Sequence, residues 1–177
     1  MRTRLSTSVT ASALAIASSC ASAPSTAQVQ ASARTPARAG ALAERFLEVY
    51  AVREDFDGLM AFYADDAEVV DMIYGNKLVG KEAIAGFLAW DKAPVSVVGD
   101  GPALIVERQV GSGHAVATEG YFRPFVFNGE RLGPWRFTIW LTFNAEGKIV
   151  QETDWINYTP REKYLGGENM NAALARR

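Results

Sequence analysis

Two carboxylates near the end of the chain, Glu152 and Asp154, have a spacing that acid and base catalysis can use. They lie in "KIVQETDWINY", residues 148–158, where alternating apolar and polar side chains predict a β-strand. Because strand side chains alternate between two faces, one face carries Val150, Glu152, Asp154 and Ile156. If that face lines a cavity, loss of water and mutual repulsion raise the pKa of at least one carboxyl toward neutrality, which suits a general acid or base. The reverse orientation, with Ile149 and Trp155 inside and both acids in water, fits the pattern equally well.

Asp71 is a second candidate, because it follows the apolar pair Val69 and Val70 in "AEVVDMIYGN", residues 67–76. One interpretation is a residue at a strand end that caps a turn, a frequent use of aspartate. The other is a carboxylate at the mouth of a pocket, within reach of Asp154. Under the second hypothesis Asp71 and Asp154 form the catalytic pair, with one carboxyl ionised and the other protonated.

Further candidates for ligand binding lie in the strands between these two acids. Glu119, Tyr121 and Arg123 alternate in "TEGYFRPF" and therefore share a face, either toward a cavity or toward solvent. An inward Arg123 would need Asp154 or Glu119 as its partner.

Aromatic residues supply the remaining binding candidates. Trp135, Phe137 and Ile139 form an apolar stripe that predicts core and pocket wall together, and Trp90 could close the cavity. Tyr50 completes the predicted lining from the first helix.

The elements that would position these residues are predicted from periodicity. Apolar residues at helical spacing from Ala37 onward, including Phe46 and Tyr50, predict an amphipathic helix. A second short helix, "GLMAFYA", is expected after a cap at Asp55 or Asp57, and "GKEAIAGFLAW" predicts a third.

After Pro94 the pattern changes to strands separated by glycine-containing turns, which indicates an α+β domain. We expect a cone-shaped, strongly curved antiparallel sheet with three N-terminal helices over its concave face, that is, a cystatin-like α+β barrel. Such a sheet leaves a cavity between its concave face and the helices.

The N-terminal residues predict export. Residues 1–27 combine Arg2 and Arg4, a short Ala-rich apolar run and small residues at a cleavage site, as export signals do. Cys20, the only cysteine, ends a sequence like a lipoprotein box, which predicts a lipid anchor; cleavage after Ala27 is the alternative, and either gives an exported, periplasmic or membrane-anchored protein. No transmembrane span is expected.

The predicted organisation is a signal over residues 1–27, a flexible linker over 28–36, one domain over 37–160 and a C-terminal tail over 161–177. Removal of the signal takes the formal net charge from −2 to −4, because Arg2 and Arg4 leave with it. An acidic mature chain is atypical of nucleic-acid binders.

The sequence predicts neither a metal site nor a cofactor. His114 is the only histidine, so the sequence has no group of His and Cys residues to hold zinc. Motifs for a serine nucleophile, a phosphate loop or a dinucleotide are also missing.

Three segments together resemble the nuclear transport factor 2-like superfamily, and within it the branch of SnoaL-like cyclases, ketosteroid isomerases and limonene epoxide hydrolases. They are "ERFLEVYAVREDFDGLMAFYADDAEVVDM", "GKEAIAGFL" and "FNAEGKIVQETDWINY", and the resemblance covers roughly residues 40 to 158. It implies the cone fold and a pocket, but this fold hosts many activities.

Residue by residue, the resemblance gives Asp71 the place of the isomerase's proton-abstracting aspartate. The isomerase's oxyanion donors correspond to Leu47 and about Ile139, which cannot donate, so that mechanism is not implied. The epoxide hydrolase motif Trp-x-Asp places its water-activating aspartate at Asp154, with Glu152 in place of tryptophan. Those enzymes have asparagine at position 71 and an Arg-x-Asp pair that "TEGYFRPF" lacks.

The sequence therefore predicts cofactor-free acid/base chemistry of the hydrolase, isomerase, dehydratase or cyclase type on a small hydrophobic molecule. In this scheme Asp154 activates water or removes a proton, Asp71 assists, and Tyr121 with Arg123 orients the substrate. The alternative is a noncatalytic module of the same fold that binds a small ligand or dimerises, and a homodimer is the expected assembly.

Overall fold

The computed structural model describes residues 26–90, 92 and 95–159. The helices are α1 (Thr26–Val52), α2 (Phe56–Met60) and α3 (Lys81–Leu88). The strands are β1 (Tyr63–Asp71), β2 (Asn76–Val79), β3 (Val95–Val97), β4 (Leu104–Ser112), β5 (Ala115–Phe122), β6 (Phe125–Phe127), β7 (Glu130–Leu132), β8 (Trp135–Phe143) and β9 (Ile149–Asn157). Most of the predicted export signal, including Cys20, and the predicted tail lie outside the described residues.

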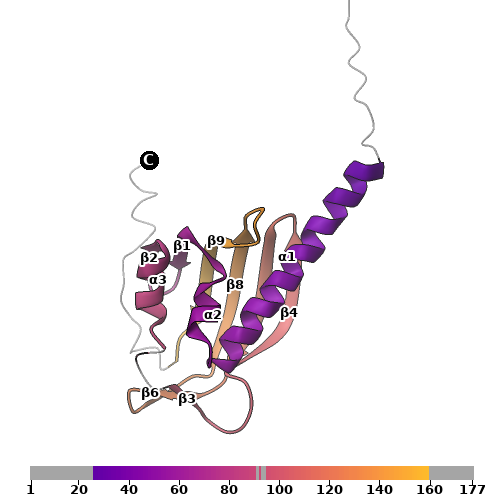
Figure 1. Ribbon diagram of the computed structural model, residues 1–177. Coiled ribbons are helices and arrows are strands. Elements are labelled where there is room, and N and C mark those ends of the chain that lie inside the picture. The colour runs from indigo at the N-terminus through magenta and orange to yellow at the C-terminus, as the bar shows by residue number, and fades with distance from the viewer. Residues whose placement is uncertain (1–25, 91, 93–94, 160–177) are drawn as a thin grey trace, which may run out of the picture.

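Six strands form the main sheet in the order β2-β1-β9-β8-β5-β4, and β3, β6 and β7 form a small second sheet. Helices α1 and α2 lie across one face of the main sheet, and the small sheet lies at one end of it (Figure 1). This arrangement confirms the predicted α+β class. It corrects two details, because β1 pairs with β9 in parallel and the sheet does not close into a barrel.

Helix α1 carries its apolar stripe toward the sheet, with Ala43, Phe46 and Leu47 buried as the periodicity predicts. It begins at Thr26, so residues 28–36 are helical where low apolar content had predicted a linker. Five of its nine residues are Gln, Ala or Arg, which have high helix propensity, and this favours the helix. In the described part of the chain, no helix has an apolar run long enough to cross a bilayer.

The second helix is shorter than predicted, because the chain enters β1 at Tyr63. Asp55 caps it, and its Oδ1 accepts a hydrogen bond of 2.7 Å from the Gly58 backbone N–H. The helix α3 agrees with the sequence prediction and packs Ile84 into the core.

The inner face of the sheet, meaning the face that α1 covers, carries the core. On β8 it presents Phe137, Ile139 and Leu141, all buried. Gly120 on β5 lies opposite Phe137 in the strand register. A Cβ atom at position 120 would lie 2.0 Å from the Ile105 carbonyl oxygen and 2.9 Å from Phe137 Cζ, so only glycine lets these strands pack as they do.

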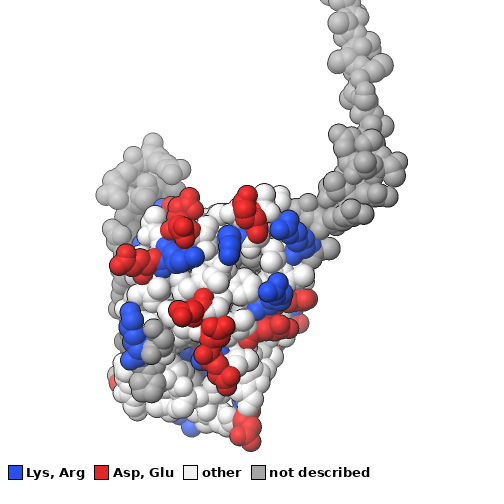
Figure 2. Space-filling view, in the orientation of Figure 1, with Lys and Arg blue, Asp and Glu red and all other residues white. Residues whose placement is uncertain are grey.

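Acidic and basic side chains are interspersed on the helical face of the molecule, as on an ordinary solvated surface (Figure 2). Several of them pair at short range, such as Lys77 with Glu68 at 3.2 Å and Lys81 with Asp65 at 3.4 Å. Exposed pairs of this kind contribute little to stability.

Candidate active site

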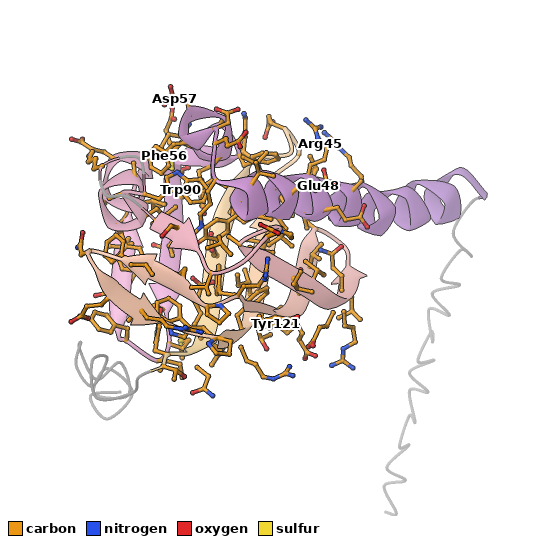
Figure 3. The ribbon with its side chains drawn as sticks, turned by 90° about the horizontal axis from the view of Figure 1, so that it is seen from below. Arg45, Glu48, Phe56, Asp57, Trp90 and Tyr121 are labelled. Atoms are coloured by element: carbon orange, nitrogen blue, oxygen red, sulfur yellow. The ribbon has the colours of Figure 1, made fainter. Side chains whose placement is uncertain are left out.

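An aromatic cavity of about 310 Å³ lies between the C-terminal end of α1, helix α3, the main sheet and the small sheet. Its walls come mostly from apolar and aromatic side chains, and Trp90 and Phe56 meet at 5.7 Å between ring centroids on the helical side (Figure 3). The lining residues are Tyr50, Arg53, Tyr74, Phe87, Leu88, Trp90, Val95, Phe122, Phe125, Phe127, Leu132, Trp135, Asp154, Ile156 and Tyr158. A volume near 300 Å³ is that of a small ligand site.

Strand β9 turns its two acids inward, which decides between the orientations that the sequence left open. Glu152 and Asp154 are buried, at 2% and 7% exposure, whereas Trp155 is 40% exposed on the outer face. Ile156 continues the inner face and lines the cavity with Asp154. Asp154 therefore lines the cavity, and Glu152 lies two residues earlier on the same face of the strand, buried behind it.

Asp71 lies on β1 directly opposite Asp154 in the parallel pairing of β1 with β9. It is 1% exposed, and its Oδ1 accepts hydrogen bonds from the backbone N–H groups of Ile73 at 2.9 Å and Tyr74 at 2.7 Å. The Tyr158 hydroxyl donates to its Oδ2. Asp71 therefore caps the turn after β1, as the first interpretation predicts, and it also lies beside Asp154. It is not among the residues that line the cavity, so the predicted position at a pocket mouth is corrected.

Burial dominates the electrostatics of the two acids on β9. It raises the pKa of Glu152 to about 7, although hydrogen bonds with Tyr63 and Asp154 oppose this shift. The pKa of Asp154 is raised well above its usual range, first by burial and then by the charges of Glu152 and Asp71. Glu152 and Asp154 are both buried and share a hydrogen bond, so this pair of carboxyls retains a proton at neutral pH.

Of the three carboxyls, Asp154 is the one that has a buried oxygen without a hydrogen-bond partner in the described part of the chain. The Tyr63 hydroxyl donates to Glu152 Oε2, and Asp71 accepts on both oxygens. Asp154 lines the cavity, and its buried Oδ1 has no hydrogen-bond partner. Asp154 is therefore the carboxyl whose hydrogen bonding is incomplete at the wall of the cavity.

The other predicted binding residues divide into two groups. Tyr50, Trp90 and Trp135 line the cavity, and Phe137 is buried in the core next to it. Phe137 contacts Phe122 at 5.1 Å between ring centroids, and Phe122 is itself a lining residue.

Glu119, Tyr121 and Arg123 do not line the cavity, which corrects the expected binding face on β5. Glu119 lies on the outer face and pairs with Arg108 at 2.8 Å. Tyr121 lies across the sheet from Trp90 (Figure 3). Arg123 instead donates to the carbonyl oxygens of Asp100 and Val98 and so holds the loop before β4. The inner face of β5 carries the buried residues Val116, Thr118, Gly120 and Phe122. Because side chains alternate along a strand, Glu119 and Tyr121 therefore point to the outer face.

Three residues of the site were not predicted from the sequence: Arg53, Tyr63 and Tyr158. The two tyrosines are the hydrogen-bond donors to Glu152 and Asp71. Burial, and then the neighbouring carboxyl, raise the pKa of each hydroxyl, so both remain protonated donors. Tyr158 lies two pleats beyond Asp154 in "TDWINY", a spacing that could have indicated a shared inner face.

Two features of the residues around this site limit its chemistry: the positions of oxyanion donors and the arrangement of metal ligands. Leu47 and Ile139, the positions where the isomerase branch carries oxyanion donors, are both buried apolar residues. No group of three His, Cys, Asp or Glu side chains within residues 26–90, 92 and 95–159 is arranged to hold a metal ion.

The six-stranded sheet with helices across one face defines an α+β fold, and the sequence assigns the family. Residues 43–152 match the SnoaL-like domain, so the chain belongs to the SnoaL-like domain family. A comparison with curated proteins found no match.

Solved structures share the fold at low sequence identity. A LEH-like epoxide hydrolase of M. tuberculosis is 20% identical with a TM-score of 0.56, covering 69% of this chain and 84% of its own. A putative SnoaL-like polyketide cyclase of Shewanella putrefaciens is 18% identical with a TM-score of 0.55, covering 72% and 96%. A putative ketosteroid isomerase of Kribbella flavida is 16% identical with a TM-score of 0.52, covering 68% and 78%. These likenesses support the fold, and the activity must be argued from the site.

Proposed function

We propose that this protein catalyses cofactor-independent proton transfer on a small hydrophobic molecule held in the aromatic cavity, with Asp154 as the general acid and base. The observation that carries the proposal is a buried carboxyl with an unpartnered oxygen at the wall of an apolar cavity. Burial and the neighbouring charges raise the pKa of this carboxyl, which favours a proton-bearing group of the kind that general acid and base catalysis uses.

The neighbouring acids have distinct parts in this mechanism. Glu152 shares a hydrogen bond with Asp154 and can take up or return the proton that Asp154 exchanges with the substrate. Asp71 is fixed by three donors and acts as a stationary negative charge beside Asp154. The reaction types that fit are those named for proteins of this fold, namely epoxide hydrolysis, isomerisation and cyclisation.

The test is a substrate panel of epoxides, enones and polycyclic ketones, incubated with the purified protein and followed by mass spectrometry. Asp154→Asn should lower turnover by at least about 100-fold, the usual contribution of one general acid or base. Asn resembles the protonated aspartate in size and polarity, so the fold should be retained. Asp66→Asn is the matched control, because Asp66 is an exposed aspartate on β1. Turnover that survives in Asp154→Asn would refute the assignment.

A noncatalytic binding protein is the second candidate, favoured by the apolar residues at Leu47 and Ile139 where an oxyanion would need donors. In that case the wild-type protein would retain panel compounds without changing them.

We also propose a homodimer formed through the outer face of the sheet. A row across four strands, Val110, Ala117, Trp140 and Thr153, runs over this face, and Trp155 lies beside it. Trp140 is 47% exposed, and large exposed aromatic side chains on a sheet face favour a partner surface.

A further inference from the structure

Three polar atoms are buried without a hydrogen-bond partner in the described part of the chain, and all three belong to residues that line the aromatic cavity. They are Arg53 Nε, Trp90 Nε1 and Asp154 Oδ1. Buried polar atoms are normally satisfied, and an unsatisfied group costs free energy. Their convergence on one cavity indicates that a bound molecule completes their hydrogen bonds.

Arg53 is the most unusual of the three, because it is a largely buried cation without a counter-ion among the described residues. Its guanidinium carbon lies 5.1 Å from the Trp90 ring centroid and 5.3 Å from that of Tyr50, with Phe122 and Phe125 within 6 Å. None of its side-chain nitrogens forms an ion pair or hydrogen bond with another residue in the described ranges. Aromatic faces stabilise the charge but leave the N–H edge of the guanidinium unsatisfied.

The backbone fixes this side chain at the end of α1. Arg53 has a left-handed backbone conformation, with φ of 58°, and its N–H donates to the Val49 carbonyl oxygen at 3.1 Å. A cation at a helix C-terminus is favoured by the helix dipole. Burial lowers the pKa of Arg53, yet a guanidinium stays protonated at neutral pH.

We propose that Arg53 and Trp90 form a carboxylate-binding subsite, so that the cavity selects a flat aromatic monocarboxylic acid. This proposal rests on the proposed function and specifies its substrate class. The planar guanidinium matches a carboxylate, and the indole N–H supplies a further donor for its second oxygen. Arg53 is the only Arg or Lys among the described lining residues, which favours a singly charged group over a phosphate dianion.

The subsite also assigns the two parts of the ligand to different lining residues. The carboxylate contacts Arg53 and Trp90, and the aromatic body packs against the remaining lining, which includes Asp154 and Ile156. The Oδ1 atom of Asp154 is buried without a hydrogen-bond partner and can accept one from the ligand after a small side-chain movement. The raised pKa of Asp154 favours its neutral form and so weakens the repulsion between this carboxyl and a bound anion.

The test compares two probes of nearly equal shape, 2-naphthoate and its neutral analogue 2-naphthamide, by isothermal titration calorimetry at pH 7.5. Wild-type protein should bind the carboxylate at least about tenfold more tightly, the ratio expected when one charge-assisted hydrogen bond is gained. Arg53→Met should reduce this ratio to near one while it retains affinity for the amide. Arg53→Lys should retain a preference for the carboxylate, and Arg136→Met, at an exposed arginine, should leave the ratio unchanged.

The outcomes separate this proposal from the proposed function. Equal affinity for the two probes in wild-type protein, or an affinity ratio that is unchanged in Arg53→Met, would overturn the carboxylate subsite. The proposal that the apolar cavity binds a small hydrophobic molecule would be unaffected. Binding of neither probe to wild-type protein would overturn both. If Arg53 only holds the aromatic rings together, Arg53→Met should lose affinity for both probes equally, which also refutes the subsite. The wild-type comparison decides the matter even if Arg53→Met fails to fold.

Discussion

Replacing Glu152 with glutamine should raise the free energy of unfolding at pH 8 by about 2 to 3 kcal/mol and leave it nearly unchanged near pH 4. The reason is the burial of this carboxyl, which raises its pKa from 4.5 to about 7. Between these values the folded state binds more protons than the unfolded state. The free energy of unfolding therefore falls as pH rises through this window, by about 1.4 kcal/mol per unit for one such group.

Glutamine resembles the protonated glutamate and removes this dependence. Its amide oxygen can accept the Tyr63 hydrogen bond, and its NH₂ group can donate to Asp154, so no buried group loses its partner. The largest increase in the free energy of unfolding that this substitution can give is about 3 kcal/mol. Coupling to Asp154 reduces the increase, because the two carboxyls share protons.

The assay is urea unfolding between pH 4 and pH 8.5, with the free energy of unfolding compared between wild type and Glu152→Gln. Glu119→Gln is the matched control, because Glu119 is an exposed glutamate on the outer face of β5. The two pH profiles should converge at acidic pH and diverge above pH 5. Parallel profiles would refute the reasoning, since they would show that Glu152 titrates alike in the folded and unfolded states.

Two further predictions test the fold and the assembly. Gly120→Ala should destabilise the protein by about 2 kcal/mol or more in urea unfolding, because its Cβ would collide with the Ile105 carbonyl oxygen. Gly86→Ala, with open space at its Cβ position in α3, should be neutral or stabilising, and a similar loss at both positions would contradict the packing argument. Trp155→Glu on the outer face should shift a dimer to a monomer in light scattering coupled to gel filtration, and a wild-type monomer would exclude the proposed dimer.

The sequence predicted those elements whose patterning is unambiguous. Helix α3 and strands β8 and β9 follow from clear periodicity, and Phe137 and Ile139 are buried as the stripe on β8 predicts. The parallel pairing of β1 with β9 joins segments far apart in the chain, and no local signal specifies it. That pairing is what places Asp71 beside Asp154.

The orientation of β9 could not be predicted from the sequence for a different reason. Each of its faces carries both apolar and polar side chains, so alternation alone gives no preference between Glu152 and Trp155 as the inward residue. Packing decides it, because the outer face leaves Trp155 uncovered while α1 covers the inner face. Arg53 escaped prediction for a related reason, since a charged residue just after a helix ordinarily lies in water.

The arrangement of hydroxyl donors explains why only one of the three acids is available for chemistry. Tyr63 donates to Glu152 from β1, and Tyr158 donates to Asp71 from beyond β9, so each of these carboxyls has a fixed position. Both tyrosines stay protonated, because burial and the adjacent carboxyl raise the pKa of each hydroxyl. Asp154 lies between the two fixed acids and is destabilised as an anion by both charges. A ligand donor at its free oxygen would relieve that destabilisation, so proton exchange at Asp154 should be coupled directly to occupancy of the cavity.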